Sequence, residues 1–186
     1  SFEGGSLRRV GAVGVFFQGV DLRGAQLANA VLRSSVFAGG RFDGASFLRA
    51  DLTQAGFVEE DLRGADFTEV EFAHASFAGA NLSGVSLVGA TGSNVDFLGA
   101  NLGGADLTGL ISRNARVDDA ILTGADLQDA EMDLASFRAV MAEGLNAQNS
   151  SLQNTDWSGS TLTDANFSGA DLTGATLTRV SAGGLS

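Results

Sequence analysis

The sequence predicts an all-β fold, a four-sided coil in which each lap of the chain takes 20 residues. Two periods predict it. Large apolar side chains recur every five residues, and glycine and aromatic residues recur every 20. A period of five matches neither the 3.6 residues of a helical turn nor the two of a strand, so the repeat indicates a solenoid built from short equivalent units.

The five-residue period runs without insertion from Leu7 to Ala182. Its 36 central positions carry 16 leucines, 11 phenylalanines and three other large apolar residues. The position two before the centre is nearly always small, and the remaining positions are rich in Gly, Asn, Asp and Ser, which favour turns. Each unit is therefore predicted to be a short extended piece with two inward side chains, followed by a corner.

The twenty-residue period predicts four units per lap. One corner in four carries glycine, from Gly24 to Gly184, with Asp164 as the exception. Because glycine adopts positive φ at little cost, we expect that corner in particular to require it. A column of large side chains has the same spacing: Phe17, Phe37, Phe57, Phe77, Phe97, Val117, Phe137, Trp157, Leu177. About nine laps fit in the chain, and at ~4.8 Å per lap the rod is ~43 Å tall.

The unit resembles the pentapeptide-repeat family, whose pattern A-[DN]-[LF]-[ST]-G occurs here as ADLTG at 170–174 and ANFSG at 165–169. The resemblance covers residues 5–184, and we expect residues 1–186 to form a single solenoid domain. Members of that family fold as right-handed quadrilateral β-helices. The resemblance therefore implies the same fold and the same hand for this chain.

Six central positions hold small residues, and five of them follow an unusually large residue two positions earlier, as Leu110 precedes Ser112. A smaller central residue is thus compensated by a larger neighbour in the same unit, and packed interiors tolerate best the changes that conserve total volume. Gly92 has only Ala90 as its partner, so we expect a local void or an inward shift of the backbone there. Residues 108–119 and 138–150 are the least regular stretches and the candidates for a bulge.

Composition narrows the classes of partner. The chain has 11 arginines, no lysine and 22 acidic residues, for a net charge of −11. Such a chain is not expected to bind nucleic acid directly or to bind an anionic membrane surface, but it suits a basic protein groove. There is no cysteine, and no stretch approaches the 18 apolar residues of a membrane span. We expect a cytoplasmic protein.

No group of residues predicts catalysis, a cofactor or a metal site. A hydrolase needs a nucleophile, a base and an orienting group, and the one histidine, His74, is expected to lie at a surface corner. The glycine-rich residues 99–109 are repeat units with no helix after them, so they are not a phosphate-binding loop. The acids follow the repeat and do not form a calcium-binding loop. We therefore expect a protein that is not an enzyme.

Acidic residues concentrate in two stretches. The lower acidic band, which includes one arginine, Arg63, consists of Glu59, Glu60, Asp61, Asp66, Glu69 and Glu71. The upper acidic band, which includes no arginine, consists of Asp118, Asp119, Asp126, Asp129, Glu131 and Asp133. We predict that the side chains of both bands contact a basic partner. Reversal of Asp126, Asp129, Glu131 and Asp133 to lysine is expected to abolish binding without unfolding the rod, because these four side chains are expected to face solvent or corners.

The family resemblance implies a partner. Well-studied members protect DNA gyrase and topoisomerase IV from quinolones and other poisons by occupying the DNA-binding saddle. Duplex DNA ~43 Å long carries ~25 charges, so a net charge of −11 is roughly half of that density. An end-to-end homodimer improves the imitation. The loop and the C-terminal dimerising segment of many protective members are not found within residues 1–186.

Two other functions remain open. The first is a scaffolding rod that binds other proteins, as a segment of a longer chain or through its open ends, because uncovered coil ends invite association. The second is binding to an ice or crystal surface through threonines at 161, 163, 173, 176 and 178. The threonines do not continue along one face for the whole rod, because Arg33, Arg113 and Asp133 intrude, which makes the second reading the weaker one.

Overall fold

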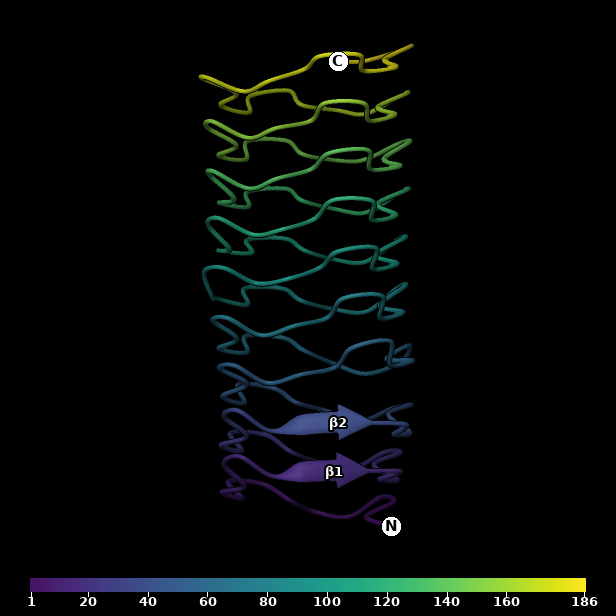
Figure 1. The fold of residues 1–186 in the computed structure, drawn as a ribbon, viewed down its shortest axis with the longest axis vertical. Helices are drawn as coiled ribbons and strands as arrows, with labels where there is room; N and C mark the ends of the chain where they lie inside the picture. Colours follow the sequence, from purple (N-terminus) through teal and green to yellow (C-terminus); the bar gives the residue numbers. More distant parts are fainter.

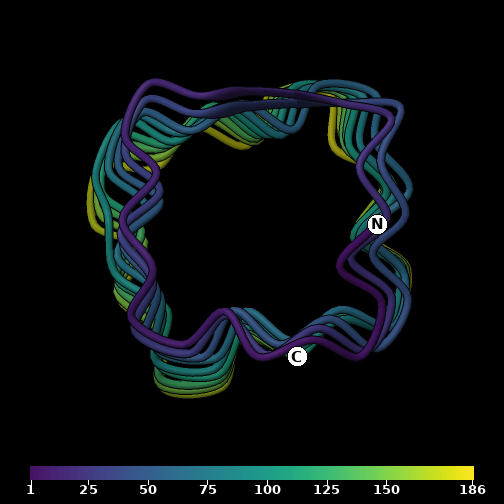
Figure 2. The same cartoon turned by 90° about the horizontal axis from the view of Figure 1, so that it is seen from below.

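The computed structural model describes all residues from Ser1 to Ser186 as one column of stacked laps, with the chain ends at opposite ends of the column (Figure 1). Every β-bridge is parallel and joins a residue to the one 20 positions ahead, as Asp66 to Ser86. Seen along the column, the laps superimpose into a square outline (Figure 2). The predicted lap of 20 residues is therefore confirmed.

The strands of this coil are short. Most pairing takes the form of isolated bridges, one per five-residue unit, and only β1 (Phe16–Gln18) and β2 (Val36–Ala38) extend to three residues. They pair in parallel with Phe17 opposite Phe37. There is no α-helix, and hence no helix that could cross a membrane. We number the faces 1 to 4 by their inward residues, which begin in the second lap with Leu22, Leu27, Leu32 and Phe37.

The corners correct one prediction. Positive φ is found in every unit from Gly4 to Gly184, at 19 glycines and at 18 other residues. The restriction to one corner in four is therefore wrong, because each tight turn needs this conformation on all four faces. Residues with a side chain bear a strain of ~1–2 kcal/mol there. Crowding does not explain why glycine recurs at one corner of each lap, since a Cβ at Gly84 or Gly124 would meet nothing within 4 Å.

Inward side chains form one continuous apolar core of 51 buried residues. The predicted column on face 4 is confirmed: the Phe57 ring stacks on Phe37 at 4.6 Å and on Phe77 at 5.2 Å between centroids. In a later lap Trp157 stacks on Phe137 at 4.0 Å. Aromatic pairs add to the stabilisation that apolar burial provides.

The irregular stretches behave differently from one another. Residues 108–119 and 138–150 keep the regular bridges and turns, so neither bulges. At Gly92 the backbone lies close to the lap below: an added Cβ would lie 2.5 Å from the Ala73 nitrogen and 2.7 Å from the Phe72 carbonyl carbon. A shallow hollow opens on the outside at this point. The void or inward shift expected at Gly92 stays a prediction.

Candidate partner-binding surface

Neither acidic band forms a patch on one side of the rod. Because a lap takes 20 residues, the lower band of residues 59–71 passes from the corner of face 4 to face 3. The upper band of residues 118–133 likewise covers parts of faces 4, 1, 2 and 3. Side chains that are neighbours in sequence therefore point in different directions, and the acids that share a face are those 20 residues apart.

Two predicted contact residues are buried. Glu60 lies at the inward position that other units give to small residues, and its carboxylate accepts hydrogen bonds from the Gly39 and Gly40 amides. Asp118 is 4% exposed and accepts hydrogen bonds from the Ser136 hydroxyl and the Arg138 guanidinium. Glu60 and Asp118 are therefore not free for the partner contact predicted for them, because both carboxylates are buried and bind groups of an adjacent lap.

The pKa of Asp118 follows from these contacts. Burial raises the pKa of this carboxyl, but hydrogen bonds from Arg138 and Ser136 outweigh burial and hold it below its usual range. Asp118 therefore stays ionised at neutral pH as part of a structural ion pair. It is not available to a partner as a free charge.

Arginines of adjacent laps or units neutralise several other acids. Glu69 pairs with Arg49 at 2.6 Å, and Asp61 pairs with Arg63 at 2.7 Å. The hydrogen bonds from these arginines lower the pKa of both carboxyls. In the upper band, Glu131 lies 3.0 Å from an arginine of the previous lap. The absence of arginine within residues 118–133 does not leave that stretch unpaired, because pairing crosses the laps.

The same arginine, Arg113, also approaches Asp133 at 3.8 Å. Asp133 in addition accepts hydrogen bonds from the Ser151 hydroxyl at 2.6 Å and the Gln153 amide at 3.1 Å. A lysine at position 133 would lose both hydrogen bonds to the next lap. The charge reversal proposed from the sequence would therefore also perturb the fold.

Four acids of face 2 form no ion pair with arginine. The acidic strip of face 2 consists of Asp66, Asp106, Asp126 and Asp129. None of the four forms an ion pair; they accept hydrogen bonds from amides or neutral side chains, as Asp126 does from the Asn146 amide group. Asp106 was not predicted, although its spacing of 20 from Asp126 is the signal that reveals it. Three further acids of the bands are exposed and without an ion pair: Glu59, Glu71 and Asp119.

The spacing of the strip is less regular than that of a DNA strand. Three laps separate Asp66 from Asp126, which is ~14 Å at ~4.8 Å per lap. Asp66 and Asp106 are two laps apart, Asp106 and Asp126 are one lap apart, and Asp129 lies in the same unit as Asp126, whereas charges recur every ~3.4 Å along a single strand of B-DNA. No arginine follows Arg49 along this face of the rod. The arrangement presents a line of negative charge to a basic surface.

Face 1 shows the opposite arrangement in its first laps. Its outward charges alternate in sign both along the chain and between laps, in two columns: Asp21, Arg41 and Asp61, beside Glu3, Arg23, Asp43 and Arg63. Arg23 donates hydrogen bonds to Asp21 and Glu3, and the pKa of Asp21 falls to about 2, chiefly through the Arg23 hydrogen bond. This face has little net charge and does not imitate DNA.

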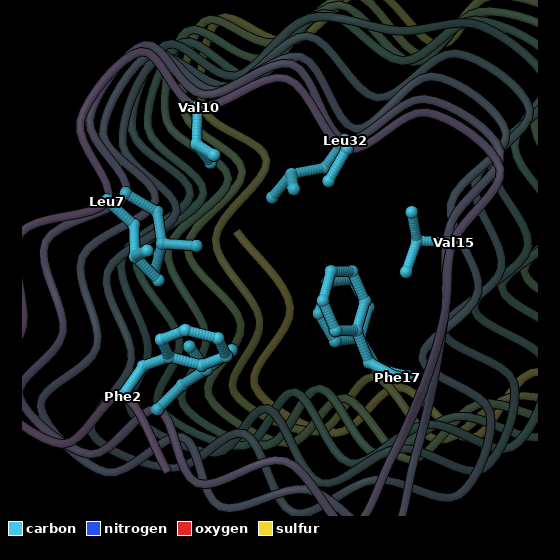
Figure 3. A pocket seen from close by; sticks show the side chains of 10 residues that line it. Phe2, Leu7, Val10, Val15, Phe17 and Leu32 are labelled. Carbon is cyan, nitrogen blue, oxygen red and sulfur yellow. The ribbon is translucent and has the colours of Figure 1, made fainter.

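The remaining surface offers no catalytic constellation. His74 is exposed at a corner with φ 59°, as predicted, and no cluster of His, Cys, Asp or Glu is arranged to hold a metal. An apolar hollow of about 240 Å³ opens at the N-terminal end of the core, lined entirely by hydrophobic side chains (Figure 3). Phe2, Leu7, Val10 and Phe17 are among them, so this hollow suits apolar contact and presents no reactive group.

A coil of five-residue units with carboxylates on its faces defines the class of pentapeptide-repeat solenoids. Pentapeptide repeats match in eight copies over residues 14–47, 45–84, 71–109 and 143–179. The chain belongs to the pentapeptide-repeat family. No curated protein matches it.

Solved structures agree with this assignment. One trypsin-treated variant of QnrB1, a plasmid-mediated fluoroquinolone resistance protein, has a TM-score of 0.62 at 20% identity, covering 96% of this chain and 79% of the QnrB1 chain. A second trypsin-treated QnrB1 variant has a TM-score of 0.50 at 15% identity, covering 94% of this chain and 92% of the other. HetL from the cyanobacterium Nostoc sp. PCC 7120, a protein involved in regulating heterocyst differentiation, has a TM-score of 0.48 at 23% identity, covering 92% and 86%. At these identities the QnrB1 likeness shows the fold.

Proposed function

We propose that this chain is a non-enzymatic acidic rod that binds a type II DNA topoisomerase, DNA gyrase or topoisomerase IV, as a mimic of DNA. In this proposal the rod modulates the action of antibiotics on that enzyme. The observation that carries it is the acidic strip of face 2, four carboxylates on one face that form no ion pair with arginine. The strip is ~14 Å long, so it occupies part of the DNA-binding groove of the partner.

Two findings support the proposal. The chain belongs to the pentapeptide-repeat family, and its resemblance to well-studied members implies topoisomerase protection. QnrB1, which shares its fold, is a fluoroquinolone resistance protein. The net charge of −11 favours association with a basic groove and disfavours binding to nucleic acid itself. The proposal includes a bacterial, cytoplasmic location. It also includes the finer architecture that the family implies, a right-handed quadrilateral coil of about nine laps.

A supercoiling assay tests the proposal. Purified gyrase is measured with and without the rod, in the presence and absence of a quinolone. We expect the rod to restore supercoiling in the presence of the drug, or to inhibit supercoiling when added in excess without it. If the rod changes neither reaction over a wide concentration range, and topoisomerase IV gives the same result, the proposal is rejected.

Variants locate the contact surface. The triple variant Asp106→Asn, Asp126→Asn and Asp129→Asn removes three charges and keeps an oxygen acceptor at each position. We expect it to lose most of the binding and to show a weaker dependence on salt, because fewer charges take part. The control changes Glu69 and Glu131 to glutamine, two exposed acids already paired with arginine. If both variants bind equally, the acidic strip of face 2 is not the contact surface.

The alternative is a protein-interaction scaffold, and a different surface favours it. Val13, at the corner where face 3 meets face 4, is 62% exposed. On face 4, Phe16 is 62% exposed, and Val36 and Val58 are about half exposed. Exposed apolar patches of a few hundred Å² mark protein contacts. An end-to-end homodimer through the apolar hollow of Figure 3 would cover part of this surface. Light scattering after size exclusion tests this: a monomer for both the native protein and Phe16→Ser contradicts the homodimer.

A further inference from the structure

One β-bridge between successive laps is missing. We call each such bridge, with its backbone hydrogen bonds, a rung. Every residue at the first position of a unit, from Ser6 to Thr161, is bridged to the residue 20 ahead, with the single exception of Arg41. The amides of Phe42 and Asp61, which would form this rung, donate to no backbone carbonyl. The equivalent rungs one lap before and one lap after are intact. The defect is therefore local, and it lies on face 1.

Two residues that depart from the repeat account for the defect. Glu60 occupies an inward position where other units carry glycine, a small residue or an aliphatic one, and its carboxylate cannot join the apolar core. It turns instead to the lap below, accepting the Gly39 amide at 2.6 Å and the Gly40 amide at 2.8 Å. These bonds replace the regular bonds of that corner. The carboxylate thus stands between the laps where a backbone rung is expected.

Gly40 lies directly below Glu60 in the same column. A Cβ added to Gly40 would lie 2.5 Å from the ring of Phe42, so the ring takes the space of the missing side chain. The next corner is also altered, because the Gly44 amide donates to the Gly64 carbonyl, one residue beyond the regular acceptor. Regular pairing between the two laps is therefore lost between residues 39–44 and residues 59–64, whereas residues 46–57 keep their regular bridges.

The defect opens a hollow of about 200 Å³ on face 1. It is lined by Arg23, Gly40, Arg41, Phe42, Asp43, Asp61 and Arg63. A water molecule takes ~30 Å³ in the liquid, so several fit, and the lining is polar enough to hold them. Water therefore has access to backbone groups that the other laps bond to one another. We call this interruption of the ladder the seam.

We propose that the seam is a preformed opening point, at which residues 1–45 separate from the rest of the rod as a unit. In a solenoid each lap contacts only its neighbours, so the weakest interface determines where the column opens. The interface at the seam has lost its rung and is open to solvent at the hollow. Opening there leaves all four acids of the face 2 strip on the intact part of the rod. The N-terminal laps can then change orientation while that surface stays folded.

Native-state hydrogen exchange with increasing denaturant tests the proposal. We expect the Phe42 and Asp61 amides to exchange on the order of 100-fold faster than the matched amides of Leu22 and Asn81. We also expect the amides of residues 5–40 to share one opening reaction, with a step in protection between residues 40 and 62. Simple fraying from the chain end would produce a gradual slope over the same residues.

The variant Glu60→Ala gives the position a small residue that the repeat normally uses. We expect it to restore the rung, protect the Phe42 and Asp61 amides, and remove the step. Glu59→Ala is the matched control, because Glu59 is exposed and unpaired, and it should leave the step in place. A gradual slope in the native protein, or a step that persists unchanged in Glu60→Ala, overturns the proposal.

Discussion

Phe57 is the residue whose truncation should weaken the core most. Its ring is fully buried and forms aromatic pairs with five others, stacked on Phe37 and Phe77 and edge-on to Phe42, Phe47 and Phe67. Phe57→Leu keeps an apolar residue that the repeat uses at many central positions. The change therefore isolates the aromatic contribution from the general burial of apolar surface.

The size of the effect follows from these pairs. Each aromatic pair contributes about 0.5–1.5 kcal/mol beyond burial, so the two stacked pairs alone account for about 1–3 kcal/mol. The smaller leucine also leaves a cavity, which adds about 1 kcal/mol. We expect Phe57→Leu to lower the free energy of unfolding by about 2–4 kcal/mol. The control is Phe167→Leu, whose ring forms one edge-on pair and should cost about 1 kcal/mol.

Urea denaturation followed by far-ultraviolet circular dichroism gives the free energies. The single tryptophan, Trp157, is buried against Phe137 and provides a second probe more than four laps away. Coincident transitions by both probes justify a two-state free energy, which repeat proteins do not always satisfy. A cost for Phe57→Leu no greater than that for Phe167→Leu would refute the reasoning, because the stacked column would then add nothing to apolar burial.

Three further outcomes are expected. Ser112→Ala should raise the free energy of unfolding by about 1–3 kcal/mol in the same urea assay, because the Ser112 hydroxyl is buried without a partner; a destabilised variant contradicts this. Gly92→Ala should cost about 1–3 kcal/mol or more, since its Cβ would overlap the backbone below, whereas Gly124→Ala in open space should cost only the strain of positive φ; equal costs contradict the close contact at Gly92. Asp118, with its lowered pKa, contributes stability that is present above its unfolded pKa and lost as pH falls through the folded value, so the destabilisation by Arg138→Gln at pH 7 should decline as the pH is lowered; an effect that does not change with pH contradicts the ion pair.

The lap and its core could be predicted because they depend on spacing alone. A large residue every five positions determines which side chains point inward, and the recurrence at 20 brings Phe37, Phe57 and Phe77 into one stack. Corner conformation could not be inferred from the glycine column. Residues such as Leu134 and Ala139 adopt positive φ as well, because closure of the lap imposes it and the strain at each corner is small compared with the burial in each lap.

The candidate surface was harder to predict because charge pairing crosses the laps. Arg49 meets Glu69 at a spacing of 20, and Arg113 meets Glu131 at a spacing of 18, so counting charges along the chain misplaces the free acids. Sorting the charges by position in the lap would have revealed Asp106. The Glu60 side chain was also visible in the sequence as a charged residue in a column of small ones.

Nothing in this fold requires unpaired acids to stand in a column. Like charges opposite each other on neighbouring strands are destabilising, and Asp106 and Asp126 are bridged in successive laps. Face 1 shows that the same geometry accommodates alternating signs, with Asp21, Arg41 and Asp61 in one column. The rod therefore bears on face 2 a repulsion that its own architecture can avoid. A basic partner relieves that repulsion, so binding should weaken as salt rises and should depend on face 2 more than on the total charge of the rod.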